Sequence, residues 1–150
     1  MRGVIQRVSQ ASVSIDEKKV ASINEGLLVF LGIEIQDTKE DSEWLANKIS
    51  QLRIFSDEEG KMNKSVTEVD GEVVVVSQFT LHAKTKKGNR PSYIKASRPE
   101  HAIPLYKQFK QDMSAVTGKE VQSGEFAADM KVSLTNDGPV TIIIDTKNKE

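Results

Sequence analysis

The sequence has no cysteine, only four prolines and few aromatic residues (5%). Without cysteine the chain forms no disulfide, carries no thiol nucleophile and offers no thiolate to a metal. No apolar run approaches the roughly 18 residues of a membrane span, and residues 1–7 lack the apolar core of a signal peptide. We therefore expect a cytoplasmic protein that makes no contact with a membrane.

The net charge of the 150 residues is only −1, but the charges are unevenly distributed, because one stretch has no acidic residue. The segment from Val73 to Pro99 has cations but no aspartate or glutamate. These cations are Lys84, Lys86, Lys87, Arg90, Lys95 and Arg98. Such a patch favours contact with phosphates, as on a nucleic-acid-binding surface, but a solvated basic loop has the same composition. Composition alone leaves both interpretations open.

Hydrophobic periodicity predicts a domain rich in strands. The predicted strands alternate apolar and polar residues or are β-branched, and they lie at 4–8, 12–15, 20–23, 27–33, 54–55, 73–79, 130–135 and 140–145. The continuous apolar run at 27–33 is typical of a strand buried on both faces. The last two strands are predicted to join through a turn with the sequence Asn-Asp-Gly-Pro.

Two helices complete the predicted secondary structure. Thr38 and Asp41 have the spacing of a capping box and open a helix that ends near residue 52. Pro99 favours a first helical turn and Gly118 a C-terminal cap, which predicts a second helix over 99–116. Residues 82–98 form a long loop. With no repeat or linker, we expect one α+β domain over 1–150, with a mostly antiparallel, barrel-like sheet covered by two helices.

Conventional catalytic residues are scarce. His82 and His101 lack further ligands at metal-binding spacing, so no metal or other cofactor is expected; His82 follows the strand at 73–79 and is placed near any site there. Ser77 and Thr80 offer hydroxyls, but a hydroxyl nucleophile needs a neighbouring base and the sequence shows none. Backbone N–H groups near Gln78 and Phe79 are the alternative, because they are able to stabilise an oxyanion.

The Gly138-Pro139 pair has two interpretations. It is either a plain turn between strands or a rigid peptide whose carbonyl groups face a ligand. Only about one X–Pro bond in twenty is cis, so the residues alone do not predict a cis bond.

Several segments together resemble one family, the bacterial D-aminoacyl-tRNA deacylases, over essentially the whole chain. They occur in the family's order at 1–8, 26–29, 52–55, 60–63, 76–81, 87–92, 124–130 and 136–141. The two most distinctive read Ser-Gln-Phe-Thr-Leu, from Ser77, and Asn-Asp-Gly-Pro-Val-Thr, from Asn136. Each segment is a weak signal by itself, but their number and order make the resemblance specific.

The resemblance implies a homodimer that hydrolyses D-aminoacyl-tRNA at sites between its two copies. Each site would combine the catalytic segment Ser77, Gln78, Phe79 and Thr80 of one copy with Gly138 and Pro139 of the other. A cis Gly-Pro peptide would then exclude L-amino acids while admitting D-amino acids and glycine, which is selectivity by clash. Arg7 and Asn136 would support that motif.

The resemblance also assigns the tRNA contacts. Its terminal 2′-hydroxyl would assist hydrolysis, Thr80 would position rather than attack, and Phe126 and Met130 would pack around the terminal adenosine. Lys86, Lys87 and Arg90 would meet acceptor-stem phosphates.

Two positions depart from the family pattern. The chain has His82 where the family often has tyrosine, and Ala127 where it often has glycine. An alanine at position 127 would be strained if its φ is positive.

Two other functions remain as alternatives. The basic loop alone fits an RNA-binding module without catalysis, and Thr80 alone fits a small amide hydrolase. Neither alternative accounts for the joint presence of the two distinctive segments.

Overall fold

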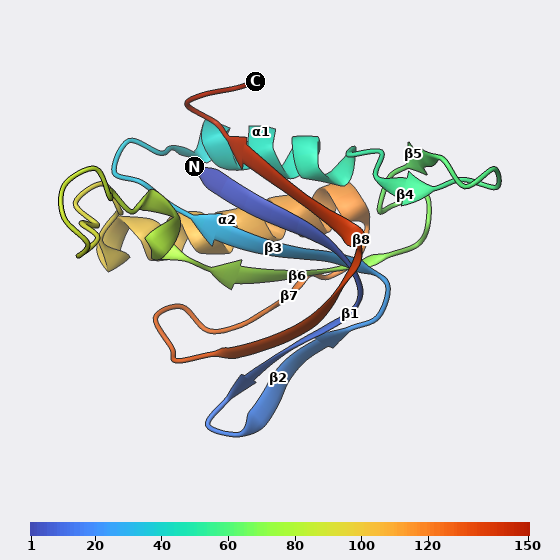
Figure 1. The fold of residues 1–150 in the computed structure, drawn as a ribbon, viewed down its shortest axis with the longest axis horizontal. Helices are drawn as coiled ribbons and strands as arrows, with labels where there is room; N and C mark the ends of the chain where they lie inside the picture. Colours follow the sequence, from blue (N-terminus) through green and yellow to red (C-terminus); the bar gives the residue numbers. More distant parts are fainter.

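The computed structural model describes all 150 residues as a twisted sheet with two helices on one face (Figure 1). The sheet strands are β1 (Arg2–Ile15), β2 (Lys18–Ile23), β3 (Gly26–Gly32), β6 (Glu72–Ser77), β7 (Gln122–Ser123) and β8 (Lys131–Asp145). The other elements are the helices α1 (Lys39–Ser50) and α2 (Pro99–Thr117), the hairpin of β4 (Phe55–Ser56) and β5 (Met62–Lys64), and a 3-10 turn, η1 (Phe79–His82).

The strand order is β2-β1-β3-β6-β7, and β8 also pairs with β1, along the edge opposite β2 and β3. The pairs made by β1 are antiparallel, whereas β3–β6 and β6–β7 are parallel. The strong twist carries β2 and the first part of β8 round toward the far edge of the sheet, so the sheet is nearly a barrel (Figure 1). The predicted α+β class with two helices and a barrel-like sheet is confirmed.

Strand β1 corrects the prediction of separate strands at 4–8 and 12–15. It runs without a break because each half has a partner: residues 2–8 pair with β3 and residues 11–15 with β2, while β8 follows the opposite edge. The polar residues Ser9 and Gln10, which suggested an interruption, lie exposed where the partner changes.

Strand β8 corrects the predicted turn between residues 135 and 140. Lys131–Asp145 is one strand, and the Asn-Asp-Gly-Pro segment is an irregularity within it. Gln6 pairs with Thr141 and Val8 with Asn136, so one residue of β1 faces four residues of β8. The segment therefore bulges out of the ladder instead of reversing the chain.

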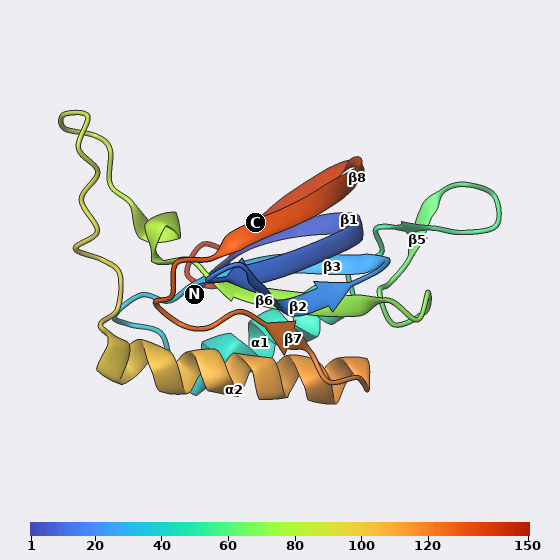
Figure 2. The same cartoon turned by 90° about the horizontal axis from the view of Figure 1, so that it is seen from below.

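Both helices cover the same face of the sheet, as Figure 2 shows from the side. The main core lies between them and the sheet; its apolar residues include Leu45 and Ile49 of α1, and Phe109 and Met113 of α2. The α2 helix ends as predicted at Gly118, which has φ +75°. Burial of each large side chain contributes about 1.5–3 kcal/mol, which holds the helices against the sheet.

The end of β6 corrects the predicted strand at 73–79. The strand stops at Ser77, and the chain enters the 3-10 turn η1 instead of remaining extended. Ser77 and Thr80 therefore belong to different elements, and the alternation rule for strands no longer applies to them.

Candidate functional site

The first distinctive segment is held in place by a buried parallel pair of strands. Ser77 lies opposite Leu31, and the N–H of Gln78 donates to the Leu31 carbonyl oxygen at 2.8 Å. This N–H is therefore engaged in the sheet, so it is not a free oxyanion donor. The backbone donors that were expected near Gln78 and Phe79 are therefore those of Phe79 and Thr80.

The N–H groups of Phe79 and Thr80 begin the 3-10 turn, where a helical turn leaves its donors without partners. Neither of these two N–H groups donates a hydrogen bond to a turn carbonyl or to a side chain. The side-chain amide of Gln78 donates to Thr80 Oγ1 at 2.5 Å, which fixes that hydroxyl. The turn thus presents two adjacent backbone donors beside a restrained hydroxyl.

A pocket of about 440 Å³ opens next to this turn. Its walls come from the ends of β3 and β6, the N-terminal end of α2 and the segment from Phe126 to Val132. Ten of its fourteen lining residues are hydrophobic, and none is Asp, Glu, His, Lys or Arg. The pocket therefore holds no side chain that is able to act as a general base near neutral pH.

Phe126 and Met130, which were assigned to the adenosine, both line this pocket. The ring of Phe126 packs against Tyr106, with 5.9 Å between centroids. Tyr106 donates its hydroxyl to the Val75 carbonyl oxygen at 3.1 Å, and its burial raises the pKa of the phenol to about 12. The phenol therefore stays neutral and supports the wall of the pocket.

Ala127 lies between these residues with φ +66°, in the left-handed region. Alanine was expected to be strained at this position if its φ were positive, and the backbone does have positive φ here. An L-residue there carries roughly 1–2 kcal/mol of strain that glycine would avoid.

The second distinctive segment is braced by side chains and is itself exposed. The Nε of Arg7 donates to the Asp137 carbonyl oxygen at 3.0 Å, and its Nη1 to the Ile54 carbonyl oxygen at 2.6 Å. Asn136 Oδ1 accepts from the Val140 N–H at 3.0 Å. Arg7 therefore holds the carbonyl that precedes Gly138, rather than those of the Gly-Pro pair itself.

The peptide bond between Gly138 and Pro139 is cis, and both residues are exposed. Gly138 has φ +130°, and an added Cβ would lie 2.9 Å from Arg7 Nη2 and from Val140 Cγ2. Only glycine fits this position without displacing one of the two residues that brace it.

Within one chain, the two segments lie far apart. Arg7, under the Gly-Pro bulge, pairs with Leu27 at the start of β3, whereas Ser77 pairs with Leu31 near its end. Four strand positions separate them by about 13 Å along β3. Neither Gly138 nor Pro139 lines the pocket. The structure brings Ser77–Phe79, Phe126 and Met130 together, but the Gly-Pro motif stands alone.

The histidines are placed outside the pocket. His82, the last residue of η1, is buried next to Gly32, and its Nε2 has no partner. It does not line the pocket, so the expectation that it would lie at the site is not met. His101 is exposed on α2, and its Nδ1 lies 2.6 Å from Ser97 Oγ.

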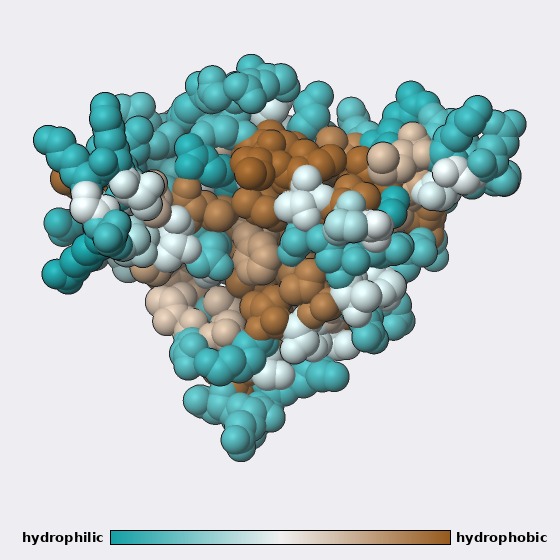
Figure 3. Space-filling model, in the orientation of Figure 1, coloured by the Kyte–Doolittle hydropathy of each residue, from teal (hydrophilic) through white to brown (hydrophobic).

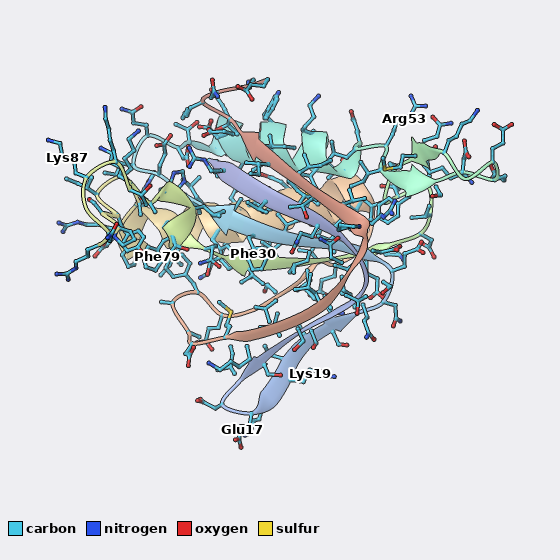
Figure 4. The ribbon with its side chains drawn as sticks, in the orientation of Figure 1. Glu17, Lys19, Phe30, Arg53, Phe79 and Lys87 are labelled. Carbon is cyan, nitrogen blue, oxygen red and sulfur yellow. The ribbon has the colours of Figure 1, made fainter.

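The basic loop projects from the same end of the molecule as Phe79 (Figure 4). Lys86, Lys87 and Arg90 are exposed, and none of them forms an ion pair. The sequence reasoning did not single out Tyr93 in this loop, although its ring contacts Phe79. The missed signal was an aromatic residue among the cations.

Arg2 was also missed. Its Nη1 donates to the Leu81 carbonyl oxygen at 2.6 Å, and its Nη2 to Asp145 Oδ2 at 2.8 Å. It therefore ties the η1 turn to the end of β8. The one signal for Arg2 in the sequence was its place in the opening segment that resembles the family.

The fold and site define an α+β domain with an apolar pocket, free backbone donors and an exposed Gly-Pro bulge. The family model described as "D-Tyr-tRNA(Tyr) deacylase" matches residues 4–145, and the chain belongs to this family of hydrolases. Neither helix is long and apolar enough to cross a bilayer.

Full-length relatives support the same family. A D-aminoacyl-tRNA deacylase of Flavobacterium psychrophilum is 65% identical and one of Bacteroides fragilis is 63% identical, each over 100% of both chains. A solved structure named c-Myc DNA Unwinding Element Binding Protein is 38% identical, with a TM-score of 0.91 over 97% of this chain and 99% of the other. A probable eukaryotic D-amino acid tRNA deacylase, 17% identical, shares the fold with a TM-score of 0.82 over 95% and 97%.

Proposed function

We propose that this protein hydrolyses the ester of D-aminoacyl-tRNA in the cytoplasm and releases free D-amino acid and tRNA. The observation that carries the proposal is a pocket of substrate size that has no ionisable side chain and is lined by Phe79, whose N–H, like that of the adjacent Thr80, has no partner. A reaction in such a pocket must take its proton-transferring group from the substrate or from water. The terminal ribose of a tRNA supplies one beside the ester.

Hydrolysis would proceed by addition of water to the ester carbonyl carbon. The N–H groups of Phe79 and Thr80 would bind the oxyanion that forms, an effect often worth 10²–10³-fold per donor. The 2′-hydroxyl of the terminal adenosine would hydrogen-bond the attacking water in place of a protein base. When the tetrahedral species collapses, the bond to the 3′-oxygen breaks, and that oxygen takes up the proton that the attacking water gives away. Thr80, restrained by Gln78, would position the substrate.

The proposal includes a homodimer, because the sheet leaves an apolar face open. Opposite the helices, Ile143, Val4 and Phe30 lie side by side on neighbouring strands. Ile143 is 69% exposed, and Val4 and Phe30 are half-buried. Figure 3 shows apolar residues gathered at the centre of this face, where a second copy would cover them.

A two-fold axis through this face would complete the site. The pocket lies at one end of the sheet and Gly138 with Pro139 at the other, and an isologous contact brings opposite ends together. The Gly-Pro backbone of one copy, braced by Arg7 and Asn136, would then enter the other copy's pocket. The side chain of an L-amino acid would clash with that backbone, while a D-amino acid or glycine would fit.

The remaining contacts extend the substrate out of the pocket. Phe126 and Met130 would pack on the adenine, as their place in the lining supports. Lys86, Lys87 and Arg90, free of ion pairs, would bind acceptor-stem phosphates, with an affinity that falls as salt rises.

The test is hydrolysis of matched D-tyrosyl-tRNA and L-tyrosyl-tRNA by the purified protein. The proposal predicts loss of the D-ester only. Cleavage of both esters at similar rates would refute the chiral filter, and cleavage of neither would refute the activity.

Nucleic-acid binding without hydrolysis is the second candidate, and the basic loop favours it. The relative named as a DNA unwinding element binding protein has the same fold at 38% identity. Retained RNA binding with neither ester cleaved would select this candidate.

A further inference from the structure

An aromatic pair links the catalytic turn to the basic loop. The rings of Phe79 and Tyr93 meet edge to face, with 5.0 Å between centroids and 75° between planes. Phe79 is 56% exposed and Tyr93 is 37% exposed, which is unusual for large aromatic residues of a small domain. The neighbouring Ile94 is 72% exposed, so an apolar surface continues along the loop.

The pair lies on the route out of the pocket. Phe79 lines the pocket, and Tyr93 lies beyond it on a loop whose two arms are joined by hydrogen bonds between Lys84 and Ser92, at 2.8 and 3.0 Å. Figure 4 shows Phe79 between the sheet and the part of the loop that carries Lys87. A chain leaving the pocket in this direction meets rings first and cations second.

The charges around the pair favour a polyanion. The loop cations from Lys84 to Arg98 form no ion pairs, and no acidic residue lies between Val73 and Pro99. Exposed aromatic rings beside unpaired cations are the combination that binds single-stranded nucleic acid: bases stack on the rings, and the cations follow the backbone. A base-paired nucleotide offers no free face to such a platform.

We propose that Phe79 and Tyr93 form a stacking platform for the unpaired nucleotides that immediately precede the terminal adenosine of the RNA. The inference rests on the proposed function, which places that adenosine in the pocket. Every base has a π-face, so the platform tolerates any base and contributes affinity rather than sequence selectivity. Tyr93 is the residue that this inference adds to the site.

The test compares Tyr93→Ala and Tyr93→Phe on three substrates. These are D-tyrosyl-tRNA, the same tRNA with abasic sites at the two nucleotides before the terminal adenosine, and D-tyrosyl-adenosine. For the intact tRNA, Tyr93→Ala should raise KM about 5- to 20-fold with kcat nearly unchanged, which matches the loss of one stacked base. Tyr93→Phe, which keeps the ring, should behave as wild type.

The two substrates that lack these bases isolate the platform. Tyr93→Ala should change KM for neither the abasic tRNA nor the adenosine ester, because both lack the stacked bases. An equal loss on all three would show that Tyr93 merely supports the pocket, and no loss on the intact tRNA would show that no base stacks there; either result overturns the inference. Val20→Ala, an exposed apolar residue of β2, is the matched control and should leave all constants unchanged.

Failure of the deacylase proposal is separable from failure of this inference. If the wild-type protein cleaves no D-ester, the binding of uncharged intact and abasic tRNA still measures the platform. Weaker binding of the abasic form to wild type, and no such difference for Tyr93→Ala, would support it. Equal binding of both forms by wild type would overturn it.

Discussion

The two distinctive segments differ in shape and support. The segment at Ser77–Thr80 ends a buried parallel strand and borders a recess, so its backbone is fixed by the core beneath it. The segment around Gly138 is a bulge in an edge strand, exposed and braced only by Arg7 and Asn136. One provides a cavity with donors, and the other provides a projecting backbone. The difference favours the proposal that the two segments complete one site only when two copies of the chain meet.

The largest effect is expected from removing the 2′-hydroxyl of the tRNA, which is proposed to do the work of the base that the pocket lacks. Replacing the terminal adenosine of D-tyrosyl-tRNA by its 2′-deoxy form should reduce single-turnover hydrolysis about 10²–10⁴-fold, the usual contribution of a proton-transferring group. Binding of the tRNA should change little, and a competition assay with uncharged tRNA controls for this. Undiminished hydrolysis would mean that the protein supplies the base after all.

The next effect concerns the bulge. Gly138→Ala places a methyl group 2.9 Å from Arg7 Nη2 and Val140 Cγ2, so it displaces one of these side chains and strains a backbone with φ +130°. Hydrolysis of L-tyrosyl-tRNA should rise about 10-fold or more, because each 1.4 kcal/mol of lost exclusion is a factor of ten.

The control is Gly60→Ala, also at positive φ but with nothing within 4 Å of the added Cβ. This variant should lose some stability and keep full selectivity. If Gly138→Ala kept the same D-to-L ratio as Gly60→Ala, the exclusion role of the bulge would be wrong.

A smaller effect separates positioning from attack at Thr80. Thr80→Ala removes the acceptor of the Gln78 amide and should lower kcat by less than about 10-fold, since one hydrogen bond is worth about 1 kcal/mol. Loss of a true nucleophile costs far more, about 10⁴–10⁶-fold in a triad hydrolase. A loss of that size in single-turnover measurements, with tRNA binding intact, would identify Thr80 as the nucleophile.

The smallest effect concerns the stability of the fold and should leave the activity of both distinctive segments unchanged. Burial raises the pKa of Asp41, but hydrogen bonds from Thr146, Lys147 and the Thr38 N–H outweigh it, so the pKa lies well below the usual range. A depressed carboxyl pKa stabilises the fold above the unfolded value near 4, and this contribution is lost as pH falls. Asp41→Asn should cost about 1–2 kcal/mol at pH 7.

The readout for Asp41→Asn is urea unfolding between pH 7 and pH 2.5. The difference from wild type should narrow below pH 4, and deacylation at pH 7 should be unchanged. A difference in the free energy of unfolding that stayed constant with pH would contradict the assignment to Asp41 ionisation.

Much of the fold follows from local pattern. The apolar run of β3, the Thr38–Asp41 contact at the start of α1 and the Gly118 cap of α2 are local signals, and the structure has all three. The errors came from long-range pairing. Nothing near Ser9 reveals that β1 changes partner there. Asn-Asp-Gly-Pro has the composition of a turn, but pairing with β1, over 120 residues earlier in the chain, keeps β8 a single strand on both sides of it.

The site was predicted less completely, for a related reason. The hydrogen-bond state of the Gln78 N–H depends on the carbonyl of Leu31, on another strand, so sequence alone could not tell which donors are free. The lack of a base was visible in the residue list and holds in the pocket lining. The contact of Tyr93 with Phe79 required the path of the loop.

The most direct test of the central claim mixes two variants. Phe79→Pro deletes one backbone donor at the first position of the turn, where proline is tolerated, and should inactivate the pocket it belongs to. Gly138→Ala alone should hydrolyse L-tyrosyl-tRNA. When it is mixed with excess Phe79→Pro, each intact pocket should receive an intact Gly-Pro segment from its partner.

The account predicts that L-ester hydrolysis disappears on mixing while D-ester hydrolysis persists. Native mass spectrometry confirms that mixed dimers have formed. If L-ester hydrolysis continued unchanged in those mixed dimers, the two segments would belong to a site within one chain, and the account of a site shared between two copies would be contradicted.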